Sequence, residues 1–221
     1  DLTAMNARLK ILGINGSPRK ANTDILLDEA MESVAGENIE TEILYLRKLD
    51  IRFCIGCFKC FDKHENEFGC QINRDAMDEI IPKLKSCHGL LLATPVYFGQ
   101  VTAQMKAFMD RTEPLLRYVH SPWRSTLKNK IGAGLVIGGN RHGGQETTLQ
   151  SIHHFFLIHD MMVVGTGSDD RPGCYLGAAA TTHPQRGRVI GAVKDDELGV
   201  KAARLISRRL VEVVRRQFGR P

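Results

Sequence analysis

Short apolar runs that end in turn-forming residues alternate along this chain with longer segments whose apolar residues repeat at helical spacing. The short runs predict strands at residues 9–15, 41–46, 89–94, 132–137 and 161–165. The longer segments predict helices at residues 23–34, 75–85, 102–116, 146–159 and 195–217. Alternation of this kind indicates a parallel sheet with helices on both faces. We therefore expect a doubly wound, five-stranded parallel sheet in a three-layer α/β/α arrangement.

A single domain accounts for residues 1–221, because no internal repeat, linker or low-complexity segment interrupts the alternation. Hydrophobic residues make up 43% and charged residues 25% of the sequence, as in ordinary globular proteins. No apolar run approaches the roughly 18 residues that a membrane span requires, and residues 1–10 lack the apolar core of a signal peptide. We expect a cytoplasmic protein without a membrane partner.

The formal net charge of +5 raises the question of a polyanionic partner such as nucleic acid. Much of the excess lies toward the carboxyl end of the last predicted helix, where cations complement the negative end of the helix dipole. The residues concerned are Arg204, Arg208, Arg209, Arg215 and Arg216. The charge therefore has a local explanation, and we expect no nucleic-acid partner.

The loop after the first predicted strand has the composition of a phosphate site. It reads GSPRKANT, residues 16–23, and enters a predicted helix whose first backbone N–H groups are free to bind an anion. Its candidate binding residues are Ser17, Asn22 and Thr23 as side-chain donors, Arg19 as a fixed positive charge and Pro18, which stiffens the turn. The loop matches neither G-x-G-x-x-G nor a Walker A motif, which disfavours a dinucleotide-binding Rossmann domain and a P-loop NTPase. The alternative is an ordinary first turn of an α/β protein.

Two motifs together resemble a known family. G-S-P-R-x-x-N-T after the first strand and P-V-Y-F-G after the third are similar to the NADPH-dependent FMN reductase branch of the flavodoxin-like superfamily. The segment Thr94–Thr112 is the most specific part of the match, which continues through residues 138–146 and covers nearly the whole chain. The resemblance implies a flavodoxin-like fold, bound FMN and a flavin-dependent oxidoreductase activity.

The resemblance also implies which residues contact the flavin. An isoalloxazine ring has apolar faces and polar edges, so a turn with apolar side chains and free backbone N–H groups suits it. The expected contacts are Pro95, Val96, Tyr97, Phe98 and Gly99 from the second loop, and Gly138, Gly139, Asn140, His142 and Gly143 from the third. The alternatives are core aromatics for Tyr97 and Phe98, and an exposed loop histidine for His142.

Four of the six cysteines are concentrated in a polar loop at about residues 53–71. Cys54, Cys57 and Cys60 form a C-x2-C-x2-C triplet, and Cys70 follows after nine intervening residues. Three thiolates at this spacing suit three corners of an iron–sulfur cubane, and a more distant one suits the fourth. The leading hypothesis is a [4Fe–4S] cluster, and the triplet resembles the compact motif of the iron–sulfur flavoproteins, a subgroup with the same FMN fold.

The gap before Cys70 departs from that motif, in which the fourth cysteine follows sooner. Other states of the thiols therefore stay open. Zinc binds four thiolates, with His64 as a replacement for one, although zinc sites more often use two separated pairs. Free or redox-active thiols are the simplest alternative, and a disulfide is disfavoured in a reducing compartment. We expect Cys87 and Cys174 to bind no metal, Cys87 as a core residue.

Three functions are compatible with these features. The first is an iron–sulfur flavoprotein that transfers electrons between a one-electron carrier such as ferredoxin, or NAD(P)H, and a small acceptor. The second is a cluster-free NAD(P)H-dependent FMN or quinone reductase. The third is non-enzymatic, a flavodoxin-like electron carrier or a flavin sensor, which the net charge of +5 disfavours because flavodoxins are usually acidic. No catalytic side chain is expected, since the cofactors supply the chemistry.

A nicotinamide donor would have to bind over the flavin, because no separate nicotinamide domain is visible in the sequence. Arg171, Arg186 and Arg188 are candidates for its phosphate, although a solvated surface is the favoured interpretation of these residues. The resemblance implies a homodimer or homotetramer with flavin sites at subunit interfaces. Tyr118 and Trp123 are aromatic residues that suit such an interface.

Overall fold

The computed structural model describes residues 8–36, 38–61, 69–117, 124–167, 175–183 and 186–219. Its long strands are β1 (Leu9–Asn15), β2 (Ile39–Tyr45), β3 (Gly89–Pro95) and β6 (Ile131–Gly138), and its short ones are β7 (Met162–Val163) and β8 (Ala178–Thr181). The helices are α1 (Asn22–Glu32), α2 (Met77–Ser86), α3 (Ala103–Asp110), α4 (Gln145–Ile158) and α5 (Glu197–Phe218). Three 3-10 turns, η2 (Leu46–Lys48), η3 (Glu113–Leu115) and η5 (Ala192–Asp195), and an antiparallel pair, β4 (Leu116–Arg117) with β5 (Arg124–Ser125), complete the described elements. The predicted strands and helices are therefore present, with ends shifted by a few residues.

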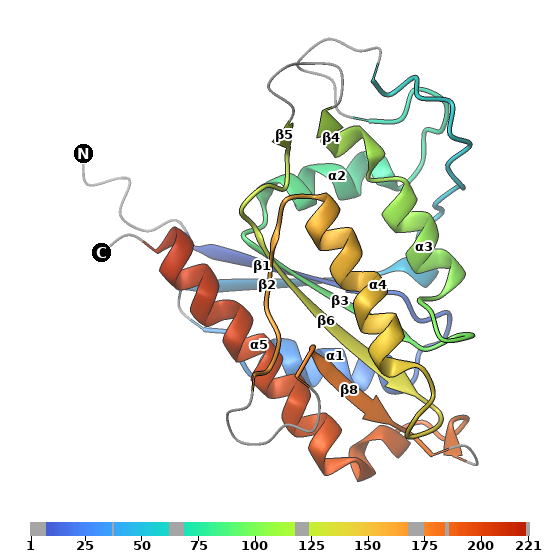
Figure 1. The fold of residues 1–221 in the computed structure, drawn as a ribbon, viewed down its shortest axis with the longest axis vertical. Helices are drawn as coiled ribbons and strands as arrows, with labels where there is room; N and C mark the ends of the chain where they lie inside the picture. Colours follow the sequence, from blue (N-terminus) through green and yellow to red (C-terminus); the bar gives the residue numbers. More distant parts are fainter. Residues whose placement is uncertain are drawn as a thin grey trace.

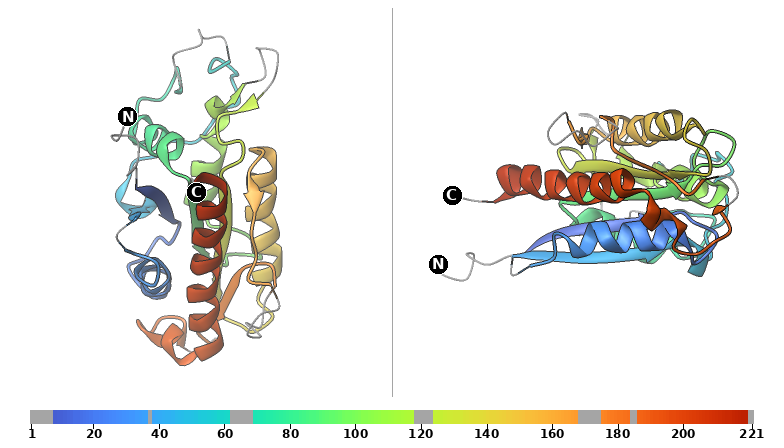
Figure 2. Two further views of the ribbon diagram at one scale, coloured as in Figure 1. Left: turned by 90° about the vertical axis from the view of Figure 1, so that its left-hand side faces the viewer. Right: turned by 90° about the horizontal axis from the view of Figure 1, so that it is seen from below.

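The main sheet has the strand order β2-β1-β3-β6-β7, and every pair in it is parallel (Figure 1). Helices α1 and α5 lie side by side on one face, and α2, α3 and α4 cover the other (Figure 2). All eight residues of β6 are buried, as expected for a central strand with helices on both sides. The fold is flavodoxin-like, and the order of its strands reverses beside β1, where ligands bind in folds of this kind.

The prediction of five strands was wrong by one, because the last position of the sheet is shared by two short strands. β7 pairs with the start of β6 at Ile131 and Gly132, and β8 pairs with its end, from Leu135 to Gly138. The described residues that follow β7 lie close to those that precede β8. A Cβ atom on Gly165 would lie 2.2 Å from the carbonyl oxygen of Tyr175. The alanine-rich segment of β8 lies inside a region that the sequence predicted to be loop.

The predicted helix at residues 102–116 ends early, at Asp110. Thr102 begins α3 as its N-cap, since its hydroxyl accepts a hydrogen bond from the N–H of Met105. Beyond Arg111 the chain turns through η3, where Pro114 has no N–H to continue an α-helix. No described helix has both the length and the apolar character that crossing a membrane would require.

A buried histidine joins three segments on the face that carries α4. His159 follows α4, and its Nε2 and Nδ1 atoms lie 2.9 Å from Thr112 Oγ1 and 3.1 Å from Ser125 Oγ. The Thr112 hydroxyl donates to the carbonyl of Met109 at 2.6 Å, so it accepts from the imidazole. Burial lowers the pKa of His159 to about 4, because desolvation disfavours the charged ring.

This histidine should make the stability of the protein depend on acidity. The unfolded chain takes up a proton at His159 near pH 6.5, whereas the folded protein does so only near its pKa of about 4. The contribution is therefore complete above pH 6.5 and is lost progressively as the pH falls to about 4, by roughly 3 kcal/mol. Urea unfolding of the wild type and of His159→Gln at pH 4.5 and 7.5 measures this. The difference in unfolding free energy between the two proteins should shrink at the lower pH, and an unchanged difference would contradict the assignment.

Candidate functional site

Parallel strand pairing brings three of the predicted site loops to one edge of the sheet. They follow β1, β3 and β6, whose carboxyl ends are neighbours in the sheet order. Gly16 in the first loop donates its N–H to the carbonyl of Ala93 at the end of β3, at 2.8 Å. Its carbonyl accepts from Thr102 Oγ1 at 2.6 Å and from Gln104 Nε2 at 3.1 Å. Both backbone groups of Gly16 are thus bonded, its N–H to β3 and its carbonyl to side chains at the start of α3.

The first loop presents an unpaired set of donors. Within the described part of the chain, the backbone N–H groups of Lys20, Ala21, Asn22 and Thr23 find no hydrogen-bond acceptor. They lie at the start of α1, where the helix dipole favours an anion. The Ser17 hydroxyl donates to the carbonyl of Arg19 at 2.8 Å and accepts its N–H at 3.2 Å, so it shapes the loop. This donor set fits a phosphate group.

Two of the predicted phosphate residues have additional or different contacts. The amide of Asn22 donates to the carbonyl of Val189 at 3.0 Å and accepts from the N–H groups of Gly191 and Val193 at 2.9 and 3.2 Å. Its side chain therefore holds the segment before α5 against the first loop. Arg19 is exposed, and its guanidinium donates to the carbonyl of Gly187 at 3.3 Å. Only the folded chain reveals these roles, since residues 187–193 are distant in sequence.

The second loop turns away from the core. The N–H of Val96 donates to the carbonyl of Ile137, and Tyr97 and Gln100 exchange two hydrogen bonds of 3.0 Å, which close the turn. Phe98 has a φ of 50° and a fully exposed side chain, and Gly99 has a φ of 72°. Tyr97 is 43% exposed. The interpretation of these aromatics as ordinary core residues is therefore wrong, and their placement suits contact with a bound ring.

The third loop is organised by a side chain that the sequence did not single out. Gln145, buried at the start of α4, donates to the carbonyl of Asn140 at 2.6 Å and accepts the N–H of Gly143 at 2.8 Å. A Cβ atom on Gly138 would lie 2.3 Å from the Gln145 amide nitrogen, which explains a glycine at that position. The side chains of Asn140 and His142 are exposed on this loop.

The cysteine-rich loop forms a separate pocket at the other end of α3. All four cysteines line a cavity of about 310 Å³ that Arg111, Glu113 and Pro114 close from the α3 side. Two sulfurs accept backbone N–H groups, Cys54 from Gly56 at 3.5 Å and Cys70 from Asn73 at 3.3 Å. Burial raises the pKa of the Cys60 thiol to about 11. The four sulfur donors, with N–H groups directed at two of them, have the chemistry of an iron–sulfur site.

The described side chains do not form a complete set of metal ligands. No group of three or more His, Cys, Asp or Glu side chains in the described ranges is arranged so that it could hold a metal ion. His64 lies outside the described residues, as does Cys174, and Cys87 is buried in the core. The zinc and free-thiol alternatives therefore remain open beside the cluster.

A buried ion pair supports the base of the cysteine pocket. Arg111 binds both carboxylate oxygens of Asp75, at 2.5 and 3.0 Å, and donates to the carbonyl of Arg52 at 2.8 Å. Asp75 in turn accepts the backbone N–H groups of Arg52 and Met77. Both side chains of the pair are at most 2% exposed. Hydrogen bonds with Arg111 and these two N–H groups lower the pKa of Asp75 against the opposing effect of burial. The pair holds the backbone of Arg52, just before the cysteine loop. The sequence did not predict this ion pair.

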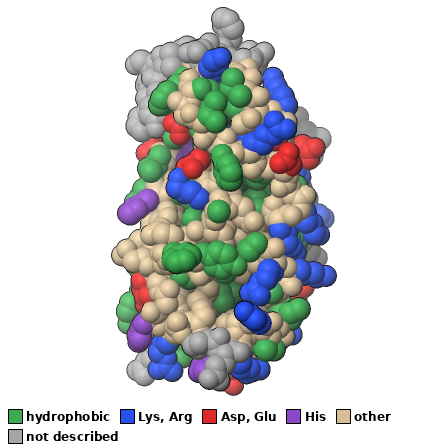
Figure 3. Space-filling view, turned by 90° about the vertical axis from the view of Figure 1, so that its right-hand side faces the viewer, with side chains coloured by type: hydrophobic (Ala, Val, Ile, Leu, Met, Phe, Trp, Pro, Cys, Tyr) green, Lys and Arg blue, Asp and Glu red, His purple; other side chains and the backbone are tan. Residues whose placement is uncertain are grey.

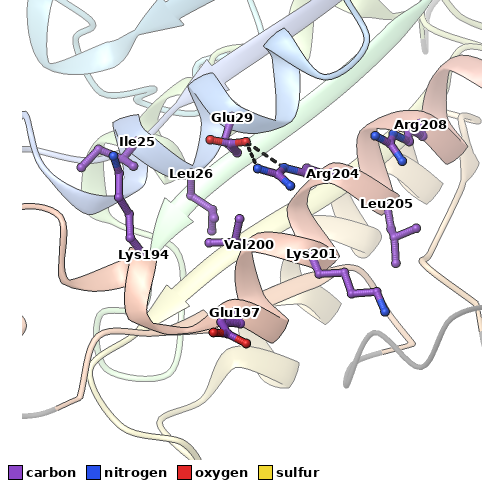
Figure 4. Close-up of a pocket in the computed structure, with 10 residues that line it drawn as sticks. All are labelled: Ile25, Leu26, Glu29, Lys194, Glu197, Val200, Lys201, Arg204, Leu205 and Arg208. Atoms are coloured by element: carbon purple, nitrogen blue, oxygen red, sulfur yellow. Dashed lines mark hydrogen bonds and ion pairs between the residues drawn. The ribbon is translucent and has the colours of Figure 1, made fainter.

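The surface at the carboxyl ends of the strands has a mixed character. Figure 3 shows hydrophobic side chains in the middle and at the top of this face, and Lys and Arg side chains along one side of it. A further groove of about 480 Å³ lies elsewhere, between α1 and α5 (Figure 4). Its walls carry the ion pair of Glu29 with Arg204, and none of the described residues predicted for flavin or metal lines it.

The contact between the second and third loops can be tested through a glycine. Gly144 has a φ of 99°, and a Cβ atom there would lie 2.7 Å from the Cα of Gly99. We expect Gly144→Ala to lower the unfolding free energy of the flavin-free protein by about 1–3 kcal/mol. Gly191→Ala is the matched control, since Gly191 has a similar φ of 91° and a Cβ atom there meets nothing within 4 Å. Urea unfolding measures both, and equal effects of the two substitutions would contradict the loop contact.

Comparisons with known proteins agree with this geometry. A family model described as NADPH-dependent FMN reductase matches residues 9–168. An iron-sulfur flavoprotein from Methanocaldococcus jannaschii is 41% identical over 208 residues, which cover 94% of this chain and 98% of that protein. An iron-sulfur flavoprotein from Methanosarcina thermophila is 42% identical over 161 residues, covering 72% of this chain and 79% of that protein.

A solved structure shows the same fold at low sequence identity. The NAD(P)H:quinone oxidoreductase from Methanothermobacter marburgensis superposes with a TM-score of 0.63 at 14% identity, covering 92% of this chain and all of that chain. At this identity the likeness extends to the fold alone.

Proposed function

The chain belongs to the NADPH-dependent FMN reductase family and is similar to its iron–sulfur flavoproteins, and from this premise we propose that it transfers electrons through FMN and a [4Fe–4S] cluster. Its class, a flavin-dependent oxidoreductase that uses FMN, follows from the family itself. The cluster, its ligands and the electron donor and acceptor are the proposed part.

We place the FMN phosphate on the unpaired N–H groups of Lys20–Thr23, with Ser17 and Pro18 shaping the loop and Arg19 adding positive charge. The isoalloxazine ring would lie against the second loop, residues 95–99, and the third, residues 138–143. FMN can exchange one or two electrons, and the protein contributes position, hydrogen bonds and exclusion of water. The exposed Phe98 and Tyr97 side chains supply apolar contact for the ring.

The observation that supports the cluster is that all four thiols line one pocket. Cys54, Cys57 and Cys60 come from one short motif, and Cys70 joins them after nine intervening residues. A cluster bound by them would exchange single electrons. Helix α3 connects the two sites, because Thr102 at its start binds Gly16 and Asp110 at its end lines the cysteine pocket. Eight helical residues span about 12 Å, so both centres would lie in one region of the fold.

Anaerobic reconstitution with iron and sulfide tests the cluster. We expect the wild-type protein to bind about four irons and four sulfides per chain. Cys57→Ser should lose most of this iron and sulfide while it keeps bound FMN, because the thiolate is a ligand and the flavin loops are elsewhere. Iron and sulfide analysis, together with the flavin absorption spectrum, measures both.

The control for this experiment is Cys87→Ala, which removes a buried thiol outside the pocket and should leave the iron content unchanged. Tight binding of one zinc without sulfide would favour the zinc site. A failure of the wild type to hold either metal would favour free or redox-active thiols.

A second candidate is a cluster-free NAD(P)H-dependent FMN or quinone reductase. The exposed second loop favours it, since a nicotinamide would have to approach the flavin from solvent there. Arg188 is exposed, whereas Arg186 forms an ion pair with Asp195, and Arg171 lies outside the described residues. The NAD(P)H donor is part of this proposal, whereas the family disfavours the alternative of a non-enzymatic carrier or sensor.

Rapid anaerobic mixing with NADPH or NADH separates these functions. If the protein is a reductase of this type, the flavin absorption of both the wild type and the cluster-free Cys57→Ser variant should bleach. If electrons enter only from a one-electron carrier such as ferredoxin, neither protein should be reduced by a nicotinamide nucleotide. Reduction by reduced ferredoxin without transfer to a small acceptor would favour a pure carrier.

Partner and assembly stay part of the proposal. We propose a homodimer or homotetramer in the cytoplasm, with small molecules or ferredoxin as redox partners. The exposed side chains of Phe53, Ile55 and Phe58 on the cysteine loop support coverage by another subunit. Tyr118 and Trp123, which we expected at an interface, lie outside the described residues.

A further inference from the structure

A nearly buried ion pair lies in the first turn of α1, next to the proposed phosphate loop. The guanidinium of Arg47 binds both carboxylate oxygens of Asp24, at 2.9 and 2.6 Å. The Asp24 side chain is 8% exposed and that of Arg47 is 13% exposed. Asp24 belongs to the same first turn as Asn22 and Thr23, whose N–H groups are unpaired within the described structure. A carboxylate and an anion site thus share one helix end.

A single asparagine connects this carboxylate to the phosphate loop. Asn15, at the end of β1, donates its side-chain amide to Asp24 at 2.9 Å. Its amide oxygen is thereby turned toward the loop, where it accepts the backbone N–H of Ser17 at 2.8 Å. Asn15 is fully buried. Asp24 therefore orients the Asn15 side chain, which in turn holds the start of the first loop at Ser17.

Further charged groups surround the Arg47–Asp24 pair through Tyr45. The Arg47 guanidinium also lies over the ring of Tyr45, 4.7 Å from its centroid, and the Lys48 ammonium lies 5.0 Å from the same centroid. The Tyr45 hydroxyl donates to Asp28 at 2.9 Å, and burial with this carboxylate raises the pKa of Tyr45 to about 12. Arg47 is thus the cation in direct contact with Asp24, and Asp28 has Tyr45 as its hydrogen-bond partner.

We propose that Arg47 is a specificity-determining residue, which neutralises Asp24 so that the loop can accept the phosphate dianion of FMN in preference to riboflavin. The inference rests on the proposed phosphate site. A dianion placed at this helix end would be repelled by an unpaired carboxylate in the same turn, and the low exposure of the pair limits screening by water. Riboflavin lacks the phosphate, so its binding should be insensitive to this charge.

Removing the charge of Arg47 and removing the charge of Asp24 should change the preference for FMN in opposite directions. Arg47→Gln leaves the carboxylate of Asp24 without a partner, so it should lower the preference for FMN over riboflavin by about tenfold. Asp24→Asn leaves the positive charge of Arg47 free to attract the phosphate, so it should raise that preference. The double variant Asp24→Asn/Arg47→Gln should return close to the wild-type value. A purely structural role would lower binding in all three variants and for both ligands alike.

The experiment uses the full chain freed of FMN and titrated with FMN and with riboflavin at pH 8, where the phosphate is a dianion. Quenching of flavin fluorescence gives the two dissociation constants and their ratio. Phosphorus NMR of bound FMN gives a second readout, since the pKa of its phosphate should rise in Arg47→Gln and fall in Asp24→Asn. The matched control is Arg204→Gln, which breaks the exposed ion pair with Glu29 on the same helix (Figure 4) and should leave the ratio unchanged.

The outcomes separate this inference from the site on which it rests. If the wild type binds FMN no more tightly than riboflavin, the phosphate site itself is wrong. If the wild type prefers FMN and Arg47→Gln keeps that preference, or if Arg47→Gln and Asp24→Asn shift the ratio in the same direction, the role of Arg47 is wrong. If circular dichroism shows that Arg47→Gln does not fold, two other variants test the role of Arg47. Arg47→Lys must keep the preference for FMN, and Asp24→Asn must raise it.

Discussion

Parallel hydrogen bonding between β1, β3 and β6 is the constraint on which the rest of this structure depends. It places the carboxyl ends of three strands at one edge, and each end continues into a loop with a candidate binding role. Gly16 shows how tight this arrangement is, since its N–H is bonded to β3 and its carbonyl to the N-cap residue of α3. A change in the register of one strand would move its loop away from the others, so the geometry of the site depends on the pairing of the sheet.

Each candidate site lies beside an arginine–aspartate ion pair that is buried or nearly buried. Arg47 with Asp24 adjoins the loop proposed to bind phosphate, and Arg111 with Asp75 adjoins the cysteine loop. In each pair the guanidinium binds both carboxylate oxygens, and the carboxylate also accepts from a neighbouring backbone or asparagine donor. Such pairs contribute little net stability but are costly to break, which suits them to hold irregular loops in one geometry.

Much of this architecture could be predicted from local patterns. The apolar runs at residues 9–15 and 89–94 have one interpretation in an alternating chain, and the structure contains both as β1 and β3. The last sheet position was harder, because β7 and β8 are too short to show strand periodicity. The predicted start of the helix at residue 102 agrees with the N-cap of α3 at Thr102. The predicted end at residue 116 does not, because α3 ends at Asp110.

The sequence by itself determined the fold class, the family and the residue types that a flavin and a metal centre need, because these depend on periodicity and on short motifs of neighbouring residues. The tertiary structure alone decided which partners those residues have. Asn22 holds residues 189–193, Gln145 ties the third loop, and Arg47 faces Asp24, in each case through a side chain whose role depends on a contact that forms only on folding. Hydrogen bonds and ion pairs act over a few ångströms in space, so the positions of two residues along the chain do not show whether they form such a contact.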